Sequence, residues 1–157
     1  MSESTANVPW LPPRWFIRLA WSVHRALYRV TGGRLGLWKP KPNGWGTLRL
    51  TTVGRRTGRE RSVMVGYFED GADLVTMAMN GWGEGEPAWW LNLQAHPDAR
   101  ADLAGGQRLV SGRAAVGDER ERLWERWRQI DDGLDGFAAR RSTETAVVIL
   151  EPRQDVS

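Results

Sequence analysis

Hydrophobic and polar residues alternate through much of the middle and end of this chain, as they do in strands that bury one face. Six such segments, bounded by glycine or acidic turns, are predicted as strands: 47–53, 62–68, 73–79, 99–103, 107–116 and 145–150. Apolar residues recur at helical spacing in three further segments, predicted as helices: 88–95, 118–130 (with Asp118 as its cap) and 134–141. Helices do not regularly separate these strands, so the order predicts an α+β fold of mostly antiparallel sheet with packed helices.

A further helix is predicted over residues 14–30, ahead of the sheet. Its four arginines form one stripe opposite an apolar face: Arg14, Arg18, Arg25 and Arg29. This pattern is typical of a helix on an anionic membrane surface, but it also fits a helix that packs on the domain or closes a pocket as a lid. We expect residues 1–33 to form a disordered tail and this helix, and residues 34–157 to form one domain.

Charge is distributed unevenly along the chain, although the net charge is only +3. Eleven basic and no acidic residues lie between Ser4 and Arg59, whereas eighteen acidic and eleven basic residues follow from Glu60. Such asymmetry indicates an anionic partner for the first third: a membrane surface, a phosphorylated ligand or nucleic acid. No nucleic-acid-binding motif is present, which argues against the last.

Composition excludes several kinds of site. Without cysteine there are no disulfides, thiolate metal sites or cysteine nucleophiles, and the two histidines, His24 and His96, are too far apart in sequence to suggest a zinc site. The ten tryptophans suit a pocket for a planar ligand. No apolar run is long enough to span a bilayer and the first residues do not resemble a signal peptide, so we expect a cytoplasmic protein.

The turn between the first two predicted strands concentrates arginine. Residues 51–61 read TTVGRRTGRER, which places four arginines within eleven residues. Backbone N–H groups of a tight turn and forked guanidinium donors suit phosphate or carboxylate groups. The segment lacks the lysine and helix of a P-loop, and no GxGxxG motif opens a helix. It is therefore either an anion cradle or a charged, solvated hairpin tip.

A glycine-rich loop over residues 80–86 leads into the helix predicted after Pro87. Trp89 and Asn92 are three residues apart and therefore share one face of that helix. They would form part of a binding site, or else Trp89 is a core residue and Asn92 a polar partner of the helix end.

Together the two motifs resemble the deazaflavin-dependent nitroreductase and quinone reductase family, split β-barrel oxidoreductases that use coenzyme F420. The resemblance rests on the paired threonines, GRRTG at 54–58, PAWWLNLQAHP at 87–97 and the closing Glu151-Pro152. It implies a split β-barrel that transfers hydride from the reduced deazaflavin to a small apolar acceptor such as a quinone or nitroaromatic. The coenzyme supplies the reactivity, so no catalytic side chain and no metal are expected.

The resemblance also implies a set of residues that bind the coenzyme. Arginines of the turn would bind its phosphate and oligoglutamate tail, and residues of the strands, the glycine-rich loop and the helix would surround the deazaflavin ring. The tail-binding set is Arg55, Arg56, Thr57, Gly58 and Arg61. The ring-binding set is Thr51, Val65, Ala78, Met79, Asn80, Trp89 and Asn92.

Two departures from the family pattern affect the expected substrate. Residues 79–82 read MNGW where many members have Ser-Lys-Gly-Gly, so one cation is missing. Leu134 and Phe137 occupy the expected substrate pocket, where nitroimidazole-reducing members carry tyrosines. These apolar residues favour quinones over nitroimidazoles. The alternatives are a non-catalytic split barrel that carries deazaflavin, haem or lipid, and an FMN-dependent enzyme of the same fold.

Overall fold

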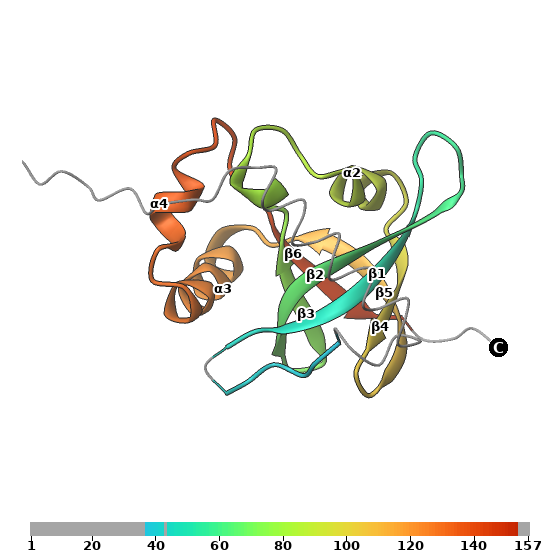
Figure 1. The fold of residues 1–157 in the computed structure, drawn as a ribbon, viewed down its shortest axis with the longest axis horizontal. Helices are drawn as coiled ribbons and strands as arrows, with labels where there is room; N and C mark the ends of the chain where they lie inside the picture. The colour runs from blue at the N-terminus through green and yellow to red at the C-terminus, as the bar shows by residue number, and fades with distance from the viewer. Residues whose placement is uncertain (1–36, 43, 154–157) are drawn as a thin grey trace, which may run out of the picture.

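The computed structural model describes residues 37–42 and 44–153, which form a closed barrel of antiparallel strands in the order β1-β2-β3-β6-β5-β4 (Figure 1). The strands are β1 (Gly46–Val53), β2 (Glu60–Asp70), β3 (Asp73–Met77), β4 (Asp98–Leu103), β5 (Gly106–Ala114) and β6 (Val147–Pro152). The predicted α+β split barrel is confirmed. The helix predicted over 14–30 and the proposed boundary at residue 33 lie outside the described residues.

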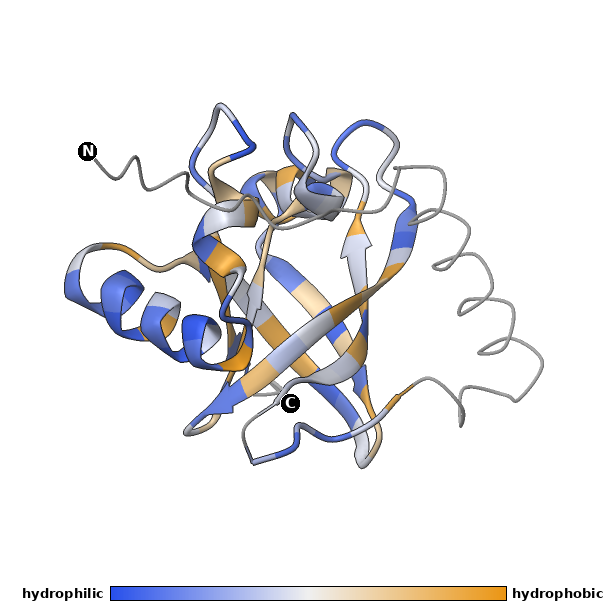
Figure 2. Cartoon of the chain, turned by 60° about the vertical axis from the view of Figure 1, so that its left-hand side comes forward, coloured by the Kyte–Doolittle hydropathy of each residue, from blue (hydrophilic) through white to orange (hydrophobic). Residues whose placement is uncertain are grey.

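Within residues 37–153, as far as the structure describes them, four helical elements accompany the barrel. They are η1 (Asn80–Trp82), α2 (Ala88–Ala95), α3 (Gly117–Ile130) and α4 (Leu134–Ala138). The α2 helix lies across one end of the barrel, whereas α3 and α4 lie together beside it (Figure 1). The α3 helix is mostly hydrophilic along its length, as Figure 2 shows, and buries only a narrow apolar stripe. No helix in the described part of the chain is long and apolar enough to cross a membrane.

The elements predicted within the described residues are all present, but some of their ends differ. The strand predicted to reach residue 79 stops at Met77, because the chain turns sharply where Asn80, Gly81 and Trp82 all have positive φ. The predicted helix over 134–141 ends at Ala138. The predicted Asp118 cap is wrong: Val116 holds the cap position without a side-chain bond, and Asp118 lies in the first turn.

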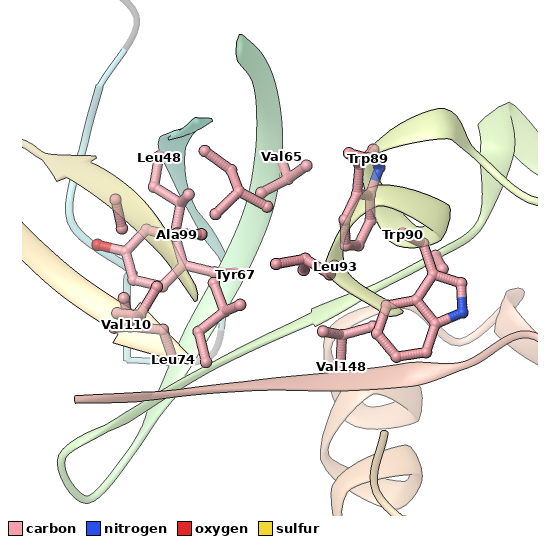
Figure 3. Packing of buried hydrophobic residues seen from close by; sticks show 14 residues of the cluster. Leu48, Val65, Tyr67, Leu74, Trp89, Trp90, Leu93, Ala99, Val110 and Val148 are labelled. Carbon is pink, nitrogen blue, oxygen red and sulfur yellow. The ribbon is translucent and has the colours of Figure 1, made fainter. Parts of the chain in front are cut away.

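The core has two parts because β2, β3 and β6 bury both faces. Tyr67, Leu74 and Val148 point into the barrel, and their neighbours Phe68, Val75 and Ile149 point toward α3 and α4. Figure 3 shows Leu93 reaching from α2 into the barrel, where it closes that end of the first core. The first core therefore fixes the position of α2 against the strands.

The approach of α2 depends on a glycine in β5. A Cβ atom added at Gly112 would lie 2.9 Å from Cδ1 of Leu93, closer than van der Waals contact allows. Glycine at this position lets the helix seat directly on the barrel end.

Candidate functional site

A cavity of 490 Å³ lies beside the loop that joins β3 to α2. Its walls come from the middle of β2 (Val63–Gly66), the end of β3, residues 79–82, the start of α2 and the end of α3. The volume falls within the range of about 300–1,000 Å³ that is usual for small-molecule sites. The cavity is thus large enough for a planar ring system.

Aromatic side chains supply much of the cavity wall. Trp45, Trp82, Trp89 and Trp127 all line it. Trp82 stacks on Phe137, with ring centroids 5.9 Å apart and an interplanar angle of 15°. Trp89 packs edge-on against Trp90 and is only 9% exposed. Flat apolar walls of this kind suit a planar, largely apolar ligand.

The turn between β1 and β2, residues 54–61, is called here the arginine turn. Its backbone is held by hydrogen bonds from the Gly54 N–H to the Arg59 carbonyl, at 2.7 Å, and from the Gly58 N–H to the Gly54 carbonyl, at 2.8 Å. Gly58 has a φ of 70°, which favours glycine. The Thr57 hydroxyl accepts a bond from the Arg59 N–H at 3.2 Å. These bonds give the turn a defined shape.

All four arginines of the arginine turn are exposed: Arg55, Arg56, Arg59 and Arg61. Among the described residues, no carboxylate forms an ion pair with any of them, and the nearby Glu60 pairs with Arg100 instead. The turn therefore presents positive charge that no carboxylate in the described part of the fold neutralises.

Asn92 connects the arginine turn to α2. Its Oδ1 accepts bonds from the backbone N–H and from Nη1 of Arg55, both at 3.2 Å, and its Nδ2 donates to Thr52 Oγ1 at 3.2 Å. The Asn92 side chain is buried and is not part of the cavity wall. Trp89, three residues earlier on the helix, does line the cavity. One helix face therefore supports both the cavity and the arginine turn.

The other residues predicted to surround the ring fall into two groups. Val65, Met79 and Asn80 line the cavity together with Trp89. Thr51 and Ala78 are buried behind it: the Thr51 hydroxyl shares a 2.9 Å bond with the Ser62 hydroxyl, and the Ala78 carbonyl accepts a bond from Arg141.

The two residues predicted for the substrate pocket are also separated. Leu134 is fully buried in the second core among residues of α3 and the barrel strands, and it does not line the cavity. Phe137 is half-buried behind Trp82 and supports that wall.

Sequence reasoning missed the end of α3 and the role of Arg141. Trp127 and Ile130 are three residues apart on α3 and form the far wall of the cavity with Asp131. Their helical spacing was a usable signal. Nothing in the sequence around Arg141 indicated that its side chain is fully buried.

The family model for F420H2-dependent quinone reductases matches residues 21–152. The chain belongs to this family. It is 28% identical over 134 residues to an F420H2-dependent quinone reductase of Mycobacterium tuberculosis, a match that covers 83% of this chain and 89% of that protein. The suspected family, the oxidoreductase class and coenzyme F420 as the coenzyme are therefore confirmed.

Solved structures share the fold of this family member. One, described as an F420H2-dependent reductase, has a TM-score of 0.58 at 22% identity over 67% of this chain and 93% of its own. Another, described as a domain-swapped dimer, has a TM-score of 0.62 at 22% identity over 88% of this chain and 99% of its own. A heme storage protein of Vibrio cholerae has a TM-score of 0.52 at 13% identity over 69% of this chain and 82% of its own. At these identities the likeness concerns the fold alone.

The residues present fit the coenzyme of the family. Coenzyme F420 combines a planar deazaflavin ring system with a phosphate and an oligoglutamate tail. The aromatic cavity suits the ring, and the exposed arginine turn carries cations that no carboxylate of the described chain neutralises. Both features lie next to α2, so one ligand can reach them together.

Proposed function

We propose that this family member transfers hydride from reduced coenzyme F420 to a quinone, and that the deazaflavin ring and the quinone meet in the 490 Å³ cavity. The observation that carries the proposal is the pairing of an aromatic cavity with an unneutralised cluster of arginines, joined through Asn92. The bound coenzyme supplies the hydride, so the residues of the chain have to bind, orient and exclude water.

The arginine turn would bind the anionic tail. Arg55, Arg56 and Arg61 would supply forked donors to the phosphate and the glutamates, while Thr57 and Gly58 shape the turn. A hydrogen bond to a charged group contributes on the order of 1.5–3 kcal/mol, so two or three such contacts account for strong coenzyme binding. Asn92 would act indirectly, by holding the backbone of Arg55 in place.

The cavity walls would orient the two rings. Trp89 and Val65 would contact the deazaflavin, and Trp82, supported from behind by Phe137, would face the acceptor. Apolar walls exclude water from the reacting faces and hold them in register, which lowers the barrier without any catalytic side chain. Trp82 and Phe137 add no phenol donor, which favours a quinone over a nitroimidazole.

The helix predicted over 14–30 would bring the pocket to a membrane-dissolved quinone at the inner face of the cell membrane. This part of the proposal rests on the arginine stripe in the sequence alone. Co-sedimentation with anionic and neutral vesicles, full-length protein against a chain that starts near Gly33, tests it. Equal and negligible binding of both chains at low salt would exclude the membrane surface.

The central experiment titrates the purified protein with coenzyme F420 and with FMN, and then mixes the reduced complex with menadione. We expect tighter binding of F420 than of FMN and oxidation of the reduced coenzyme on addition of the quinone. Tighter binding of FMN would indicate an FMN enzyme of the same fold. Binding of F420 without turnover would indicate a carrier and contradict the proposal.

A further inference from the structure

Arg141 has a guanidinium group that is completely enclosed by protein. Its side chain is 0% exposed, and each of its five N–H donors has an acceptor. Nε donates to the Gly83 carbonyl at 3.0 Å, and Nη1 donates to the Ala78 carbonyl at 3.1 Å and to Thr145 Oγ1 at 2.8 Å. Nη2 donates to the Gly85 carbonyl at 2.7 Å and to Glu86 Oε1 at 3.3 Å.

Four of these five acceptors belong to residues 78–86, called here the cavity loop. The same loop supplies Met79, Asn80, Gly81 and Trp82 to the cavity wall. Arg141 itself does not line the cavity. Arg141 therefore holds the cavity loop by hydrogen bonds without contacting the ligand space itself.

The backbone conformation of the cavity loop has to be stabilised by contacts from outside the loop. Asn80 and Trp82 have φ values of 50° and 61°, in the left-handed region that L side chains rarely adopt. Strain of this kind persists only where the surrounding structure over-determines it. Two backbone bonds close the short turn that contains it, η1, from the Trp82 N–H to the Met79 carbonyl and from the Gly83 N–H to the Asn80 carbonyl.

Ser142 provides a second anchor for the loop and, like Arg141, acts as the donor. The Glu84 carboxylate accepts bonds from the Ser142 N–H, at 3.0 Å, and from the Ser142 hydroxyl, at 2.6 Å. These bonds from Ser142 hold the pKa of Glu84 below its ordinary value. Inside the loop, Asn80 Nδ2 donates to the carbonyls of Glu84 and Gly85, at 2.8 and 3.1 Å. Residues 141 and 142 thus fasten the loop at adjacent points.

We propose that Arg141 is a positioning residue of the coenzyme and acceptor pocket: it holds the cavity loop in its strained turn, so that Trp82 stacks on Phe137 and forms the cavity wall. The inference rests on the proposed function of that pocket. Burial of an ion pair alone does not account for Arg141, because apolar residues often serve folding equally well at such sites. The N–H groups of Arg141 instead donate to several carbonyl groups of a single loop, the cavity loop.

The test compares Arg141→Lys with Arg113→Lys. Lysine keeps the charge but cannot reproduce the planar fork of five donors. Arg113 is a matched control because it also bonds through several nitrogens, to Glu119 and Glu151, and it does not line the cavity. The first readout is hydrogen exchange of the ligand-free protein at the amides of Trp82 and Gly83. The second is the dissociation constant for coenzyme F420.

We expect Arg141→Lys to speed exchange at these two amides and to weaken coenzyme binding, each by about tenfold or more, and Arg113→Lys to change neither. Unchanged exchange at Trp82 and Gly83 would overturn the proposal, and so would faster exchange without weaker binding. If the wild type binds no coenzyme, the proposed function fails, while the exchange readout still decides whether Arg141 holds the turn.

A second variant keeps the test decisive if Arg141→Lys does not fold. Glu84→Ala removes the other anchor at an exposed position and leaves no buried charge behind. It should also speed exchange at Trp82 and Gly83 and weaken coenzyme binding, by a smaller factor. Wild-type exchange and wild-type affinity in this variant would overturn the proposal.

Discussion

Two regions of the molecule are rich in arginine, and they use it in opposite ways. Around α3, arginines are paired with carboxylates: Arg113 with Glu119 and Glu151, Arg122 and Arg126 with Asp70, and Arg128 with Asp135 and Glu125. In the arginine turn, no described carboxylate forms an ion pair with any of the four arginines. The fold neutralises its own cations on one side and leaves them available on the other.

This contrast shows why the number of arginines alone does not locate a binding site. Arg122 forms two bonds of 2.9 Å with Asp70, and an anionic ligand would have to displace that carboxylate. Arg55 donates to the neutral amide of Asn92, which orients its guanidinium group without cancelling its charge. The second arrangement is the one expected of a cation prepared for an anionic ligand.

The largest effect is expected from the double variant Arg55→Ala/Arg56→Ala. Each lost charged hydrogen bond costs on the order of 1.5–3 kcal/mol, so coenzyme affinity should fall by about 100-fold or more. The unfolding free energy should change little because both side chains are exposed. Fluorescence titration with coenzymes of short and long oligoglutamate tails measures the loss, which should grow with tail length.

Arg122→Ala/Arg126→Ala is the control for that experiment, since both arginines are already paired with Asp70. It should leave coenzyme affinity within about twofold of the wild type. Equal weakening by the two double variants would mean that overall positive charge, and not the arginine turn, attracts the coenzyme. Unchanged affinity in the first double variant would remove the turn from the site.

A smaller loss is expected from Asn92→Ala. The substitution removes three hydrogen bonds and leaves the part-buried Arg55 N–H without its acceptor, which costs about 1–3 kcal/mol of stability. Coenzyme affinity should fall as well, because the arginine turn loses its support. Thermal unfolding and titration measure the two effects. A stability loss with full affinity would show that Asn92 supports the fold without shaping the turn.

Much of the fold followed from local patterns, because strands that bury one face alternate regularly and turns need particular residues. Gly71, which lies in the turn between the predicted strands 62–68 and 73–79, has a positive φ of 60°, a conformation that favours glycine. The resemblance to the family, and not these local patterns, implied that Val65, Met79, Asn80 and Trp89 lie around one ring, and all four line the cavity. That resemblance rests on short motifs that lie close to one another in the fold.

The remaining parts of the site depend on contacts between residues far apart in the sequence. Leu134 looked like a pocket residue, but whether a leucine faces a ligand or the core depends on how α4 packs. Arg141 meets Ala78, 63 residues earlier, and no local pattern distinguishes it from a solvated arginine. Charged side chains are rarely buried, so sequence reasoning assigns them to the surface by default.

The ion pairs around α3 predict that the unfolding free energy depends on pH in the acidic range. Hydrogen bonds from Arg122 hold the pKa of Asp70 below its ordinary value of 3.8. The unfolded chain then binds this proton more readily than the folded one. The contribution of Asp70 to stability is therefore complete above its unfolded pKa and is lost as the pH falls through its folded pKa. Asp70→Asn should reduce the decline of unfolding free energy between about pH 5 and pH 2.

Denaturant unfolding across that pH range measures this change in unfolding free energy. Asp73 is expected to change the pH dependence in the opposite direction. Desolvation raises the pKa of Asp73, so its contribution favours the folded state on acidification. Asp73→Asn should therefore steepen the acid decline. If both variants behave alike, the ion pairs with Arg122 and Arg126 do not set the acid sensitivity.

The smallest effect is expected from Arg128→Ala, which removes the pairs with Asp135 and Glu125. Exposed pairs contribute little to stability, and high salt screens them. The small loss of unfolding free energy should shrink in high salt, and coenzyme affinity should not change. A loss that high salt does not reduce would show that the α3 arginines support the fold more than surface pairs usually do.

The packing of α2 against the barrel affects how this enzyme can be altered by mutation. Leu93 fits against the bare backbone of Gly112, and the same short helix carries Trp89 into the cavity and Asn92 to the arginine turn. A methyl group at position 112 would force Leu93 or the whole helix outward. Movement of the helix would shift Trp89 and Asn92 together, and would therefore affect both the cavity and the arginine turn. Laboratory evolution of new acceptors should therefore sample β5, a strand that no ligand is expected to touch.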